Sequence, residues 1–281
     1  MENRIYNNTV MNGADKILLR IGNTILCNYG MTSNLGLLDG RMGACMFLYE
    51  YARHTGMKEY EEYADDMIDP ILYSLHKGQS EENISKVAGI GIGVIYLITH
   101  GFLEDTDDND ALGEVDKLLL DSIGTANAQS EKLTAASLYF IYRFVNYRAN
   151  LNMAQCLALA ENIVRLCEEY PEESKDRLLK AYIVSNARQI IRLLSEDTGS
   201  SCREEYVAYE GSLEMTAEEN TQEAIWYSYL LGTGKGLMLE YLNGIRDLSR
   251  NCFYDPDRNI GLFCAAGMTL MNRRGEQNGY C

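Results

Sequence analysis

The chain has 281 residues, of which 41 are acidic and 25 basic, so its formal net charge is −16. Electrostatic repulsion argues against a nucleic acid or an anionic membrane surface as its partner. The same charge would suit a cationic peptide, although acidity is also an ordinary means of keeping a protein soluble. The length suits a single domain over residues 1–281 with a substantial core.

The sequence predicts a protein of the cytoplasm. Its first residues are polar, and no apolar stretch reaches transmembrane length. The eight cysteines are scattered and form no C-x-x-C pair. We therefore expect most of them to be small buried side chains in a reducing compartment and not members of a disulfide framework.

In chain order, apolar residues recur at the helical period over residues 14–29, 58–75, 133–147, 153–167 and 175–194. Residues 216–219 match a capping box, which predicts a further helix over 217–232. With only three prolines to interrupt helices and no alternation of strands and helices, the chain is predicted to be all-α.

Glycines gather before several apolar runs. We predict that each group forms a tight turn, because glycine tolerates left-handed backbone and close approach. The inner helices would then start at Gly43 and near Gly93, Gly236 and Gly261. The glycines of the two clearest groups are Gly36, Gly40 and Gly43, and then Gly89, Gly91 and Gly93.

The predicted helices are of two kinds. The helix over 58–75 is amphipathic, whereas the run over 94–98 is apolar on nearly all sides. Amphipathic outer helices that alternate with apolar inner ones predict helical hairpins stacked in two layers.

These segments carry a family resemblance. GLLDGRMG with the following ACMFLYEYARHTG, and AGIGIGVIYLITHGFLEDTD, resemble the repeats of lanthionine synthetase C-like (LanC-like) proteins. The resemblance covers about residues 30–110, and IGLFCAAGMTLM near the C-terminus resembles a last repeat. It implies an α/α toroid, and for so short a chain an incomplete ring is an open alternative. It also implies a peptide cyclase, in which zinc held by two cysteines and a histidine activates a peptide thiol for thioether formation.

The chain departs from the family's zinc motifs. It lacks a Trp-Cys motif and a Cys-His pair, because Trp226 precedes a tyrosine and His54, His76 and His100 all lie in the first half. Catalytic zinc needs three converging protein ligands. We therefore expect no zinc and no other cofactor.

Two further motifs bear on a site. Asp39 and Arg41, in the first glycine turn, are the candidate catalytic residues, since the turn is expected to face the mouth of the toroid. Alternatively, Asp39 caps the next helix and Arg41 is solvated. The acidic run over 105–110 has some calcium-ligand spacing, but it lacks the glycine of a calcium loop and fits an acidic helix start better.

Three functions remain open. The protein is a LanC-like, peptide-modifying protein that has diverged from zinc-dependent cyclisation, or a non-catalytic toroid that binds a peptide or small protein. A glycosidase-like α/α barrel is the third possibility, and it would need two carboxylates across an aromatic cleft.

Overall fold

The computed structural model describes residues 13–28, 30, 33–37, 40–76, 84–104, 111–124, 130–169, 187–188, 190–191, 264, 267–268 and 271. Its elements are α1 (Gly13–Asn28), α2 (Arg41–Thr55), α3 (Lys58–His76), α4 (Ile84–Thr99), α5 (Ala111–Gly124), α6 (Ser130–Asn146) and α7 (Met153–Glu169). These described ranges contain helices and no strand, which confirms the all-α prediction. The helix predicted over 217–232, the starts near Gly236 and Gly261, and the acidic run over 105–110 lie outside them.

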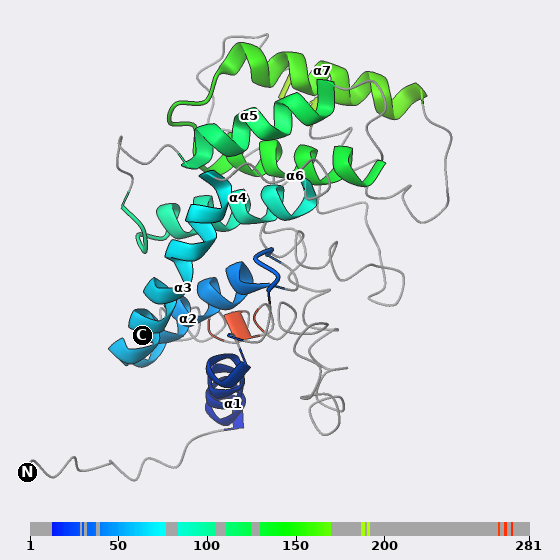
Figure 1. Ribbon diagram of the computed structural model, residues 1–281. Coiled ribbons are helices and arrows are strands. Elements are labelled where there is room, and N and C mark those ends of the chain that lie inside the picture. The colour runs from blue at the N-terminus through cyan, green and yellow to red at the C-terminus, as the bar shows by residue number, and fades with distance from the viewer. Residues whose placement is uncertain are drawn as a thin grey trace, which may run out of the picture.

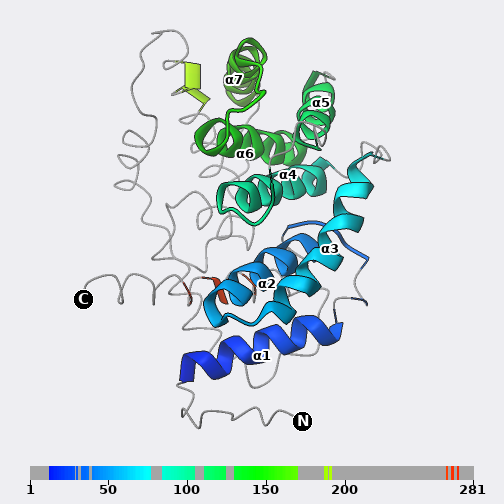
Figure 2. The same ribbon diagram turned by 90° about the vertical axis from the view of Figure 1, so that its left-hand side faces the viewer.

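The helices form two layers. Helix α4 packs against α2 on one side and α6 on the other. Helix α3 covers α2, helix α5 covers α4 and α6, and α3 and α5 contact each other. In Figure 2, α2, α4 and α6 rise as successive levels of one stack, with α3 and α5 along its outer side. Figure 1 shows α7 beyond α5 and α6, and α1 below α2. The predicted alternation of inner and outer helices is confirmed.

Burial follows the sequence pattern. Helix α4 is buried continuously from Val87 to Leu97, and α2 from Met42 to Tyr49, so both are covered on all sides. Outer helices bury one stripe only, and in α3 this stripe is Tyr60, Ala64, Met67, Ile68, Ile71 and Leu75. Even so, none of the described helices is both long and apolar enough to cross a bilayer.

The few described residues near the C-terminus lie against the first inner helix, α2. Cys264, Met268 and Met271 are helical and buried at a spacing that places them on one face. Next to them, a β-carbon added to Gly267 would lie 2.9 Å from Cδ2 of Phe47 in α2. This segment therefore packs against α2 on the side away from α3, as Figure 2 shows.

One sequence prediction is wrong. Gly89, Gly91 and Gly93 do not form a turn, because they lie inside α4, which begins at Ile84. The glycines serve packing: an added β-carbon on Gly91 would lie 2.5 Å from the Tyr139 ring and 2.8 Å from Cγ1 of Val115. Gly43 also lies within its helix, since α2 begins at Arg41. Among the described glycines of the two clearest groups, Gly36 and Gly40 lie in a turn that precedes a helix as predicted.

Replacing Gly91 by alanine tests this packing role. Alanine favours a helix interior by about 1 kcal/mol over glycine. Here its methyl group would meet the fully buried ring of Tyr139, which cannot move aside without disturbing α6. We expect Gly91→Ala to lower the free energy of unfolding by about 1–3 kcal/mol in denaturant titrations. Ser85→Ala, on the same helix but only half-buried, is the control and should change it little. A stabilised Gly91→Ala variant would contradict the packing role.

Candidate functional site

The loop before α2 is held by Asn34. The backbone N–H of Arg41 donates to the Asn34 carbonyl oxygen at 2.9 Å, and the N–H of Gly36 donates to Asn34 Oδ1 at 3.0 Å. One residue thus binds both the start of the turn and the first residue of the helix. The N-cap position falls on Gly40, whose backbone is extended (φ −139°, ψ −173°).

The turn also fixes α2 against α4. Leu37 is buried, and an added β-carbon on Gly89 of α4 would lie 3.0 Å from the Leu37 β-carbon. The Lys86 side-chain stem lies against Gly36, with Cγ 3.6 Å from where a β-carbon would stand. Gly40 has no room for a side chain, since a β-carbon there would lie 2.7 Å from the Asn34 carbonyl oxygen. The turn is therefore a tightly packed joint between two inner helices.

The predicted catalytic residues are only partly placed. Asp39 lies outside the described residues. Arg41 is the first residue of α2 and is half-buried. With Lys86 on the adjoining α4, the described charges beside the turn are basic.

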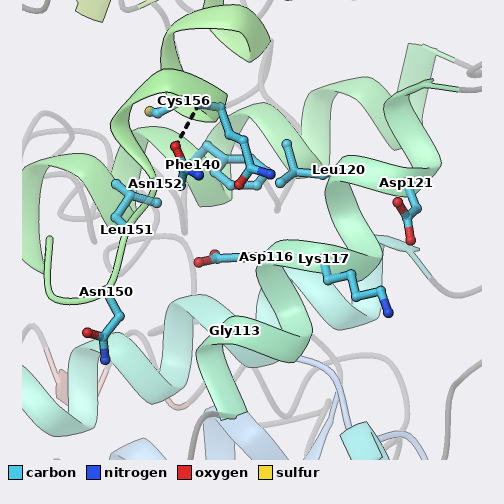
Figure 3. A pocket seen from close by; sticks show the side chains of 11 residues that line it. Gly113, Asp116, Lys117, Leu120, Asp121, Phe140, Asn150, Leu151, Asn152 and Cys156 are labelled. Carbon is cyan, nitrogen blue, oxygen red and sulfur yellow. Dashed lines mark hydrogen bonds between the residues drawn. The ribbon is translucent and has the colours of Figure 1, made fainter.

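A hollow that the sequence did not indicate lies between α5, α6 and α7. It is a cavity of about 230 Å³ between α5 and the α6–α7 connection, with Phe140 of α6 in its wall. The Asp116 carboxylate projects into it from α5, opposite Asn150 and Asn152 (Figure 3). Asn152 Oδ1 accepts hydrogen bonds from the N–H groups of Ala154 and Gln155, so it caps α7.

A buried polar network adjoins this cavity through Asp116. The Tyr139 hydroxyl donates to Asp116 Oδ1 at 2.6 Å, and Arg143 Nη2 lies 3.6 Å from Asp116 Oδ2. Arg143 is 1% exposed, and its guanidinium also donates to the carbonyl oxygens of Tyr147 at 2.6 Å and Ala149 at 2.8 Å. Burial, together with the Asp116 charge, raises the pKa of the Tyr139 phenol, so it remains a proton donor. The network fixes the end of α6 and the connection to α7.

Comparison with known proteins places the chain in a family. Residues 32–198, more than half of the chain, match the family described as lanthionine synthetase C-like protein. The chain belongs to this family. Its two-layer helical architecture agrees with the α/α toroid of LanC-like proteins. No curated protein matches the chain. No solved structure matches it either.

The described cysteines of this LanC-like protein do not fit a zinc site. Cys45, Cys156 and Cys264 are buried, and burial is the main cause that raises the pKa of each thiol, to about 11 for Cys156. The Cys45 thiol donates a hydrogen bond to the Ala64 carbonyl oxygen at 3.4 Å, and this bond also favours the protonated thiol. Zinc binds thiolates, whereas these environments favour the neutral thiol. Cys27 is exposed on α1.

The described histidines do not converge with these cysteines. His54 and His100 are exposed at the C-terminal ends of α2 and α4. The His100 ring stacks on Tyr96 at a centroid distance of 3.8 Å and lies 2.8 Å from the Tyr96 carbonyl oxygen through Nδ1. Among the residues that the structure describes, no three histidine, cysteine or acidic side chains gather as metal ligands.

The Gly40 joint can be tested directly. Because its backbone is extended, alanine is conformationally allowed, and any effect must come from the lack of space. We expect Gly40→Ala to lower the free energy of unfolding by about 1–3 kcal/mol, measured by chemical denaturation. Ser33→Ala, at an exposed position before the turn, serves as the control. Equal stabilities of the two variants would show that the turn is loosely packed.

The polar network makes a separate prediction. Asp116→Ala leaves the buried Arg143 guanidinium without its carboxylate, and we expect a loss of about 3 kcal/mol in unfolding free energy. Tyr139→Phe removes one hydrogen bond and should cost about 1 kcal/mol. Thermal and denaturant melts measure both. If Asp116→Ala cost no more than Tyr139→Phe, the Arg143–Asp116 pair would not stabilise the fold.

Proposed function

We propose that this LanC-like protein binds a cationic peptide, in the cytoplasm, and does not close thioether rings by zinc chemistry. The observation that carries the proposal is the pairing of LanC-like repeats with a sequence that lacks the Trp-Cys motif and the Cys-His pair. The buried thiols of Cys45, Cys156 and Cys264 support it, because their raised pKa values favour the neutral form and they pack in the core instead of offering thiolates to a metal.

Two features support a peptide as the ligand. LanC-like proteins, as the sequence resemblance implies, act on peptides, and a member without zinc chemistry could still bind one. The net charge of −16 would steer a cationic peptide toward the protein over a distance set by salt screening. Fold alone does not assign the role, so the ligand must be tested by binding.

The other functions have less support. A glycosidase-like site needs two carboxylates that are available to a sugar on either side of an aromatic cleft. In the α5–α7 cavity, the Asp116 carboxylate is already held by Tyr139 and Arg143. A rearranged cyclase site would need ligands that converge, and the described part of the chain does not bring three together.

A peptide titration tests the proposal at Asp39. If Asp39 faces the cavity, Asp39→Asn should weaken the binding of a cationic core or leader peptide by roughly tenfold, or about 1.4 kcal/mol. The fold should be little affected, because the N-cap position belongs to Gly40. Affinity should also fall as salt rises, since the Debye length is about 8 Å at physiological ionic strength. Fluorescence anisotropy with labelled peptides measures both effects.

The controls separate binding from chemistry. Arg41→Gln, two residues further along the chain, should not weaken the binding of a cationic peptide, because it removes a positive charge. Elemental analysis of the purified protein should give far less than about one zinc per chain. Stoichiometric zinc would overturn the non-zinc proposal, and a folded protein that binds no candidate peptide would overturn the peptide role.

A further inference from the structure

The solvent face of α3 carries an unusual share of exposed large apolar side chains. Of the exposed large apolar side chains among the described residues, Met57 (45% exposed), Tyr63 (41%) and Tyr73 (59%) lie on or next to α3, and Met153 (36%) begins α7. Tyr63 and Tyr73 lie on α3, and Met57 immediately precedes it. Exposed tyrosines that gather on one helix are typical of a protein contact, because their rings offer apolar area and a polar tip.

The exposed residues of α3 form a line. Glu59, Tyr63, Asp66, Pro70 and Tyr73 follow one another at spacings of four, three, four and three residues, and all five are exposed. This spacing places them along one side of a helix, as in the seam where two helices lie side by side. We call this line the α3 stripe. In Figure 2, α3 lies on the outer side of the stack, with α2 on its inner side.

The exposed side of α3, which includes the α3 stripe and the residues that flank it, is strongly acidic. Besides Glu59 and Asp66, the exposed side of α3 presents Glu61, Glu62, Asp65 and Asp69, whereas Lys58 is its only lysine or arginine. Two copies of such a face would repel each other, as would a nucleic acid or an anionic membrane. The charge selects a partner that is basic, and the tyrosines select one that also has apolar side chains.

The helix beneath the stripe is rigidly supported. Its inner side is buried against α2, and the Tyr49 hydroxyl of α2 donates to Asp65 Oδ1 at 2.7 Å. The T-shaped contact of Tyr51 with Tyr60, at a centroid distance of 4.7 Å, fixes the first turns. A surface that is already ordered loses little entropy when a partner binds. Changes on the exposed side should therefore leave the fold intact.

We propose that the α3 stripe is a docking surface for a basic, amphipathic helical segment of a polypeptide partner. Apolar side chains of the segment cover Tyr63 and Tyr73, while its lysines and arginines pair with the flanking carboxylates and lie over the tyrosine rings. The surface is separate from the turn at Gly36 and Gly40, where the described charges are those of Arg41 and Lys86. The inference thus goes beyond the proposed function and does not depend on it.

The test uses a labelled probe and the full-length protein. The probe is a fluorescein-tagged peptide of leucine and lysine, patterned at the helical period and about 18 residues long, which matches the length of α3. Tyr63→Ser with Tyr73→Ser should weaken its binding at least about tenfold in anisotropy titrations. Glu62→Lys with Asp66→Lys should weaken it by a similar factor and flatten its dependence on salt, because fewer ion pairs remain to be screened.

Matched controls isolate the surface. Glu104→Lys with Glu161→Lys makes the same change in net charge at exposed positions outside α3, and it should alter affinity by less than about twofold. A scrambled probe of equal composition should bind more weakly than the patterned one. If both charge-reversed proteins lost affinity equally, binding would reflect net charge alone and the docking surface would be refuted. Unchanged binding in the tyrosine variant would refute it as well. Neither result bears on Asp39, so a failure here is distinguishable from a failure of the proposed function.

Discussion

The architecture depends on how closely α4 approaches its neighbours. At Gly91 and Gly93 the side chains of Tyr139 and Met42 occupy the space that a β-carbon would need, and at Gly89 the contact is with Leu37. Three glycines within one helix weaken it intrinsically, by up to about 1 kcal/mol each. The dense contact that they allow between α2, α4 and α6 offsets this weakness through burial and dispersion.

The same device recurs where the chain returns to its first inner helix. Gly267 lets Phe47 of α2 approach the C-terminal segment, so α2 is packed between that segment and α4. Glycine at a contact between inner helices is therefore a repeated solution. It also explains why the glycine-rich segments were the part of the sequence that resembled a family: they mark the helix contacts that the toroid architecture needs.

The sequence predicted the helices and the layers because burial leaves a periodic pattern. Residues 58–75 and 153–167 were predicted within about two residues of α3 and α7, an ordinary boundary error. The error at Gly89 and Gly93 arose because alternate glycines look the same whether they break a helix or pack inside one. The Asp116–Arg143 network was missed because its partners lie on different helices. An arginine within the apolar run of α6 was the only sign of it.

In the described part of the chain, basic and acidic side chains gather on two different surfaces. Basic Arg41 and Lys86 adjoin the turn that precedes α2, whereas the acidic side chains and exposed tyrosines of α3 lie on the outer layer. Long-range charge mainly raises the rate of encounter, and buried aromatic contacts mainly slow dissociation. A basic peptide would therefore be attracted by the whole acidic surface but retained where apolar area is also available. In the described part of the chain α3 combines both properties, so its outer face suits the first contact with such a peptide.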